Sequence, residues 1–162
     1  IYVDYMYEIN IYILKSNINK YTNSEYNIKV KDIIGRGLHG LVVMIDDKVI
    51  KIYTKYNIEI EFYNKIIDDN IDINNLTCKC AIGKLTKPFI FNNFVFNKNN
   101  NILLMPFYQK LSKSKIKTKN EDFILTFIIK IFKLLIYIQN KYNYINLDVK
   151  LQNIMYDQKK KI

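Results

Sequence analysis

The chain has 162 residues, of which 49% are hydrophobic, and a formal net charge of +10 at pH 7. This is enough for one modest core or two small lobes, too little for a multidomain assembly, and too hydrophobic for a wholly disordered chain. The positively charged residues are 24 Lys and one Arg, Arg36, against 15 Asp and Glu. Lys, Ile, Asn and Tyr are abundant and all have A/T-rich codons, whereas nucleic-acid surfaces usually have clustered Arg. The charge therefore reflects an A+T-rich coding sequence, and nucleic-acid binding is disfavoured.

Cysteine usage and hydropathy limit the cellular setting. Cys78 and Cys80, with one distant histidine at His39, do not form a zinc signature and are too few for a disulfide scaffold. A reducing, intracellular compartment fits this pattern. The longest apolar stretch, residues 123–138, contains two lysines and is shorter than the roughly 20 residues that a membrane span needs. We therefore expect no membrane partner.

The first half of the chain predicts a sheet with one helix. Residues 1–27 show no clear hydrophobic period and are taken as an N-terminal extension without an assigned function. Residues 58–67 predict a short helix, because their apolar side chains recur at helical spacing. Alternating and β-branched runs bounded by turn residues predict five strands. These strands are expected at residues 28–34, 41–45, 48–53, 89–96 and 102–107.

The second half predicts mainly helix. Residues 109–119 are polar and Lys-rich, and form a connector or a short helix. Asn120 is a favourable N-cap for a helix that runs to about Lys141. This helix is apolar nearly all round, as expected for a helix buried in a larger core.

Three of the chain's four glycines, Gly35, Gly37 and Gly40, match the pattern G-x-G-x-x-G. In a dinucleotide-binding fold the third glycine opens a helix. Here the β-branched and apolar run 41–45 follows, which excludes that fold. A strand–loop–strand with this pattern suits a hairpin that covers nucleotide phosphates. An ordinary glycine-rich hairpin is the alternative interpretation.

Lys51 lies in the third predicted strand, between apolar neighbours. In a phosphate-binding hairpin it would hold the α- and β-phosphates and be positioned by a glutamate on the next helix. Glu59 and Glu61 are the candidates, and Glu59 is preferred because apolar residues follow it at +3, +4 and +7. The alternative is a solvated lysine, one of 24 in the chain.

After the long apolar helix, Asp148, Lys150 and Asn153 stand at positions i, i+2 and i+5. Such a set suits phosphoryl transfer, in which Asp accepts or orients the hydroxyl proton, Lys stabilises the transferring group and Asn coordinates Mg²⁺. A chance match is easy to find in an Asn- and Lys-rich chain. Its place after this helix and downstream of the glycine hairpin favours the functional interpretation.

Over residues 28–162 the chain resembles the eukaryotic-type protein kinase family. The motifs are the glycine-rich segment 35–42, the Val-Ile-Lys end of a strand at 49–51, the strand into the hinge at 103–108 and the catalytic loop at 146–153. Lys150, two residues after Asp148, is the serine/threonine form. The A+T bias and short strand links are similar to kinases of large arthropod DNA viruses, of baculovirus or entomopoxvirus type.

The resemblance implies an α+β, protein-kinase-like fold. Residues 28–107 would form a small lobe with an antiparallel five-stranded sheet and one helix. Residues 108–162 would form the hinge and the start of a mainly helical large lobe, ending before any Asp-Phe-Gly segment. The 162-residue piece by itself is therefore expected to be inactive. If viral, the protein would act in the infected host cell or the virion.

The resemblance also implies a serine/threonine protein kinase that uses ATP and Mg²⁺ and acts on protein Ser/Thr hydroxyls. Glycine-loop residues, Lys51 and Glu59 would bind or orient the phosphates, and Asn153 would hold the metal. The adenine pocket would be formed by Ile34, Val42, Val49, Met105, Pro106, Tyr108 and Met155. Asn146 and Leu147 replace the family's His-Arg before the catalytic Asp. The alternative is a truncated pseudokinase that binds a nucleotide or a partner without turnover.

Overall fold

The computed structural model describes residues 7–69, 79–110, 113–145 and 155–156. The chain divides into two compact units, Ile1–Phe107 and Tyr108–Ile162. This division coincides with the predicted hinge, but the first unit also includes residues 1–27, the predicted extension.

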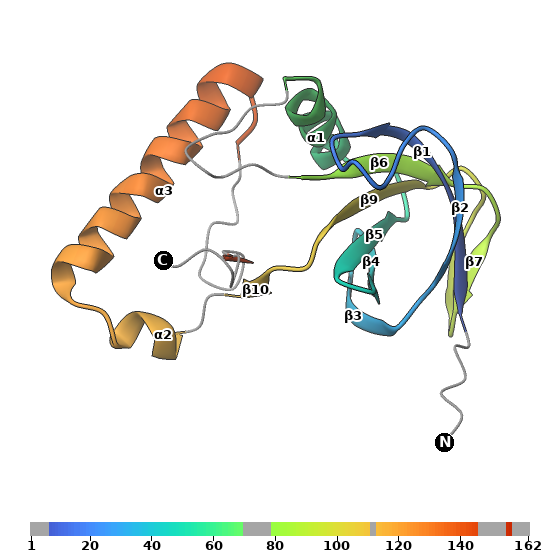
Figure 1. Cartoon of the computed structure of the whole chain (residues 1–162), viewed down its shortest axis with the longest axis horizontal. Coiled ribbons are helices and arrows are strands. Elements are labelled where there is room, and N and C mark those ends of the chain that lie inside the picture. Colours follow the sequence, from blue (N-terminus) through green and yellow to red (C-terminus); the bar gives the residue numbers. More distant parts are fainter. Residues whose placement is uncertain (1–6, 70–78, 111–112, 146–154, 157–162) are drawn as a thin grey trace. The chain divides into compact units, whose positions relative to one another are not determined.

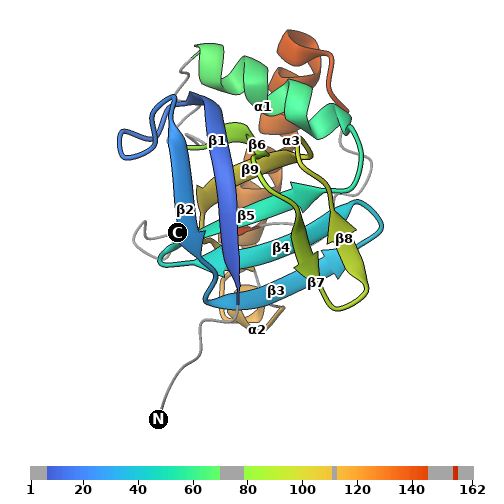
Figure 2. The ribbon, with the colours of Figure 1, turned by 90° about the vertical axis from the view of Figure 1, so that its right-hand side faces the viewer.

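The first unit contains a seven-stranded antiparallel sheet, in the order β2-β1-β6-β9-β5-β4-β3, which curls into a half-barrel (Figures 1 and 2). An α+β fold is therefore correct, but the sheet has seven strands and not five. Its strands are β1 (Glu8–Ser16), β2 (Glu25–Lys29), β3 (Asp32–Gly37), β4 (Gly40–Ile45), β5 (Lys48–Tyr53), β6 (Ala81–Leu85) and β9 (Asn101–Pro106).

The interpretation of residues 1–27 as an extension is wrong, because β1 is an interior strand paired with β2 and β6. Ile9, Ile11 and Ile13 are fully buried. Their period of two is the pattern of a strand with one face in a core. Isoleucine is so abundant along the chain that this local alternation did not stand out from the composition.

Two of the other strand predictions also change. The strand expected at 28–34 is broken, since β2 ends at Lys29 and β3 begins at Asp32. The run 89–96 is a separate hairpin of β7 (Phe89–Phe91) and β8 (Phe94–Phe96), whose turn residue Asn92 has a φ of 49°. Asn tolerates this left-handed conformation better than most residues.

In the sheet, β9 lies between β5 and β6. The sequence did not predict β6. Gly83 interrupts its apolar pattern, and glycine in a strand interior weakens a strand prediction. The structure explains the residue, because a Cβ at Gly83 would lie 2.1 Å from the carbonyl oxygen of Tyr12 in β1. Glycine lets the two strands approach each other.

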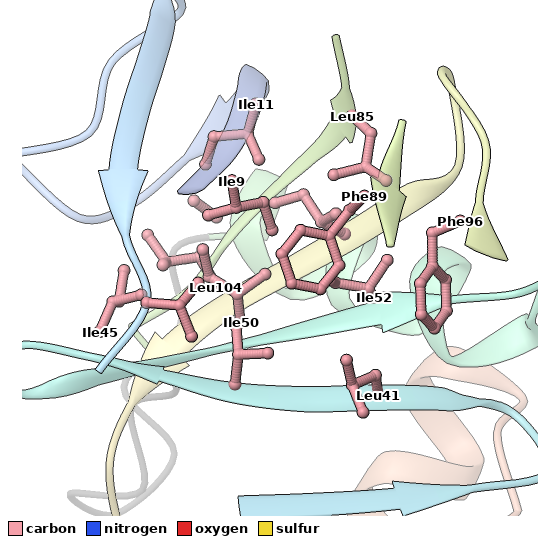
Figure 3. Packing of buried hydrophobic residues seen from close by; sticks show 14 of the residues in the cluster. Ile9, Ile11, Leu41, Ile45, Ile50, Ile52, Leu85, Phe89, Phe96 and Leu104 are labelled. Atoms are coloured by element: carbon pink, nitrogen blue, oxygen red, sulfur yellow. The ribbon is translucent and has the colours of Figure 1, made fainter. Parts of the chain in front are cut away.

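Two apolar clusters form on opposite faces of the sheet, because alternate residues of a strand point to opposite sides. The larger cluster fills the inside of the half-barrel and includes Ile50 and Ile52. Figure 3 shows ten labelled members gathered from β1, β4, β5, β6, β7, β8 and β9. The smaller cluster, on the other face, joins Tyr53 and Leu103 to the helix α1 (Ile58–Asp69).

The second unit contains α2 (Lys113–Lys117), α3 (Glu121–Tyr142) and a two-stranded pairing of β10 (Gln109–Lys110) with β11 (Met155–Tyr156). The predicted N-cap of α3 is present, since Asn120 Oδ1 accepts a hydrogen bond from the backbone N–H of Phe123 at 2.9 Å. Asn143 ends the helix in the left-handed conformation.

The apolar helix α3 is not buried over most of its length. Among its residues only Tyr142 is buried, while Leu125 is 59% and Phe132 60% exposed. The part of the chain that the structure describes does not supply the larger core that the sequence predicts around this helix, so the burial of α3 stays a prediction. No helix in that part is long and apolar enough to cross a membrane.

Candidate functional site

The strand register brings four of the predicted nucleotide-binding residues to one face of the sheet. Val42 in β4 lies opposite Lys51 in β5, and Val49 in β5 lies opposite Met105 in β9. Directly paired residues share a face, so these four side chains point to the same side as α1. Val49 is buried, and the other three are partly exposed.

The β3–β4 hairpin contains all three predicted glycines, and they differ in what the fold requires. Gly40 has a φ of 150°, and a Cβ there would lie 1.8 Å from the carbonyl oxygen of Ile52. A Cβ at Gly35 would make only ordinary contact with Val42, 3.8 Å away, and one at Gly37 would meet nothing within 4 Å. Among these three, packing therefore requires glycine at Gly40 alone, and only Gly37 faces open space.

Lys51 forms an ion pair with Glu59, in which Nζ and Oε2 are 2.6 Å apart. Both side chains are partly buried, with 28% of Lys51 and 24% of Glu59 exposed. The same carboxylate oxygen accepts a hydrogen bond from the hydroxyl of Tyr53, at 2.9 Å. The structure thus joins a lysine of β5 to the first turn of α1 by charge-assisted hydrogen bonds, which are stronger than neutral ones.

Local sequence explains why Glu59 and not Glu61 meets Lys51. Asn57 caps α1, and its Oδ1 accepts a hydrogen bond from the backbone N–H of Glu59 at 2.9 Å. An Asn at this position satisfies one of the unpaired amides of a first turn. Glu61 lies on the exposed side of the turn and accepts a hydrogen bond from Tyr56, which raises the pKa of that phenol.

Ile34 lies away from this face. It is 41% exposed, at a register shift between Ile33 and Gly35. It lines a shallow depression of about 310 Å³ together with other residues of β3, with Phe91 of β7 and with Asn92 of the β7–β8 turn. Lys51, Val42, Val49 and Met105 do not line that depression, whereas Gly35, which pairs with Val42, does.

The strand β9 ends at the expected hinge. Pro106, its last residue, is paired with Lys48, and the N–H of Phe107 donates a hydrogen bond to the carbonyl of Asp47 at 3.0 Å. Tyr108 begins the second unit. The proline therefore occupies a position where its missing N–H is not needed by the sheet, since Lys48 lies at the end of the β5–β9 ladder.

The predicted catalytic and metal-binding residues Asp148, Lys150 and Asn153 lie outside the described residues. Met155 is in β11, but its side chain is likewise outside them. Among the described residues no group of three or more His, Cys, Asp and Glu side chains is placed to hold a metal ion. The roles of Asp148, Lys150, Asn153 and Met155 stay predictions from the sequence.

Two residues of the Lys51 site were missed in the sequence. Tyr53 stands two positions after Lys51, which places both side chains on one face of a strand. Asn57 stands just before the helix and two positions before Glu59, which is a capping pattern. Both signals were present, but neither residue type is by itself unusual in a chain with 14 Tyr and many Asn.

No protein-family model, no curated protein and no solved structure matches the chain.

Proposed function

We propose that the chain is part of a serine/threonine protein kinase, which binds ATP and transfers its γ-phosphoryl group to Ser or Thr hydroxyls of proteins. The observation that supports this best is the ion pair between Lys51 and Glu59, 2.6 Å long, next to the glycine hairpin. A strand lysine paired with a glutamate of the following helix is the arrangement with which protein kinases hold the nucleotide phosphates.

The surroundings of Lys51 suit a nucleotide. The ammonium group has three donors, of which Glu59 takes one, so others are available for phosphate oxygens. Val42, which is partly exposed, and Val49, which is buried, make the same face apolar beside Lys51, as suits a base. Packing requires glycine at neither Gly35 nor Gly37, and glycine lets a backbone N–H approach a phosphate closely.

The transfer step is proposed from the sequence. Asp148 would accept or orient the hydroxyl proton, and Lys150 would stabilise the transferring phosphoryl group. Asn153 would be a ligand of Mg²⁺, an ion that neutralises phosphate charge when bound. None of these three residues belongs to the described part of the chain.

The second candidate is a pseudokinase that binds a nucleotide or a partner without turnover. Lys51 and Glu59 would bind a nucleotide in a kinase and in a nucleotide-binding pseudokinase alike, because they act in binding and not only in the transfer step. Transfer activity separates the two functions.

The first experiment is a calorimetric titration of the chain with ATP and Mg²⁺. Lys51→Met should abolish binding or weaken it by roughly tenfold or more, because a charge-assisted contact to phosphate is lost. Lys84→Met, which removes an exposed lysine of the same sheet, is the control. Glu59→Gln should weaken binding, whereas Glu61→Gln should not.

The second experiment follows radiolabel transfer from ATP to a generic basic protein, with the longest natural form of the protein. Asp148→Asn should lower the rate on the order of 10²–10⁴-fold, the usual effect of a lost general base. Binding without transfer would favour the pseudokinase. A wild-type chain that does not bind ATP, or binding indifferent to Lys51→Met, would contradict the kinase and also a pseudokinase that binds a nucleotide.

A further inference from the structure

Tyr53 ends β5 with its hydroxyl on a charged group, although its side chain is completely buried. It packs in the cluster that joins the sheet to α1, which includes Ile60 and Leu103. A ring packed in this way holds its hydroxyl at one place. That hydroxyl donates to Glu59 Oε2, the same oxygen that accepts from Lys51 Nζ.

Tyr53 also contacts the lysine. Lys51 Nζ lies 5.0 Å from the centroid of the Tyr53 ring, within the range of a cation–π interaction. The two residues are neighbours on one face of β5, so the ring lies beside the ammonium group while its hydroxyl contacts the carboxylate. Tyr53 therefore touches both members of the ion pair.

An ion pair between two long side chains loses much of its strength to side-chain freedom when both are partly exposed. A second donor from a rigid ring restricts the carboxylate to one orientation. We propose that Tyr53 is a positioning residue, which fixes the Glu59 carboxylate and, through it, the Lys51 ammonium group. Its consequence for nucleotide binding rests on the function proposed above.

The test of positioning needs no nucleotide. The coupling between Lys51 and Glu59 is measured by urea unfolding of wild type, Lys51→Met, Glu59→Gln and the double variant, and then again in a Tyr53→Phe background. Phenylalanine keeps the ring and removes only the hydroxyl. We expect the coupling free energy to fall to roughly half of its wild-type value or less, because the hydrogen bond from the Tyr53 hydroxyl supports the pair.

Tyr21→Phe is the matched control. Tyr21 is also buried, but it packs in the cluster inside the half-barrel. Removing its hydroxyl should leave the coupling between Lys51 and Glu59 unchanged. An equal loss of coupling in Tyr21→Phe would overturn the proposal. It would show that the loss comes from a general destabilisation of the sheet and not from the Tyr53 hydroxyl.

The second measurement is ATP affinity. Tyr53→Phe should weaken binding by roughly three- to tenfold, and should add no further loss once Glu59→Gln is present. If Tyr53→Phe lowers the ATP affinity of the Glu59→Gln variant by the same factor as in wild type, Tyr53 does not act through Glu59 and the proposal is overturned.

The outcomes separate the two proposals. Unchanged coupling in Tyr53→Phe overturns the role of Tyr53, whether or not the chain binds ATP. Reduced coupling in a chain that binds no ATP supports the role of Tyr53 and contradicts the proposed function instead.

Discussion

The glycines of this chain fall into two pairs. Gly40 and Gly83 are required by packing, because a Cβ at either would lie close to a backbone oxygen of a neighbouring strand. Gly35 and Gly37 have no such restriction. In a chain with only four glycines, the second pair needs another explanation, and close approach of a ligand supplies one.

This difference gives a prediction for two alanine substitutions in one hairpin. Gly40→Ala should lower the free energy of unfolding by at least about 2 kcal/mol, because both its φ and its contact with Ile52 oppose a side chain. Gly37→Ala should change it by less than about 0.5 kcal/mol, yet weaken ATP binding. Urea unfolding and calorimetry measure the two effects. An ATP affinity unaffected by Gly37→Ala would remove the ligand explanation.

At the scale of elements, α3 is a helix that exposes large apolar side chains to solvent. Its exposed apolar side chains recur at spacings of three and four, so they form one stripe along the helix. The members of this stripe are Leu125, Ile128, Ile129, Phe132 and Ile136, and Tyr137 is a further exposed residue of the helix. A contiguous apolar surface of this kind promotes association in water.

We therefore expect the double substitution Phe132→Gln and Ile136→Gln to lower the self-association of the chain. The matched control is the same change at Ile131 and Leu135, which are less exposed and should lose stability without gaining solubility. Analytical ultracentrifugation over a concentration series measures the first effect, and urea unfolding the second. Self-association that persists in the double variant would show that this stripe is not its cause.

At the scale of the molecule, the N-terminal strands belong to the folded unit. β1 lies between β2 and β6, and its three isoleucines are fully buried. Burying each such side chain is worth about 1.5–3 kcal/mol, and their sum approaches the net stability of a domain, about 5–15 kcal/mol. This is the opposite of what an added extension would show.

Deletion of residues 1–27 should therefore prevent folding of the first unit. Circular dichroism and urea unfolding of the shortened chain are the measurements, with Leu14→Ala as a control, since Leu14 is 46% exposed and its loss should be small. A shortened chain that unfolds cooperatively, at an unchanged midpoint, would restore the interpretation as an extension.

The sequence by itself determined the local features of this protein. The glycine hairpin, Lys51 in the next strand, the first helix and the Asn120 cap all follow from short-range patterns, because turn residues, alternation and caps act within a few positions. The preference for Glu59 over Glu61 also agrees with the contact that the structure places at Lys51.

Only the tertiary structure decided which strands pair and what surrounds the lysine. Long-range pairing joins β1 to β6 and β6 to β9, and depends on contacts that no local period records. Tyr53 acquires its role from a helix that folds back over its strand. In a chain so rich in Ile, Lys, Asn and Tyr, composition hides these residues, and only their neighbours in space distinguish them.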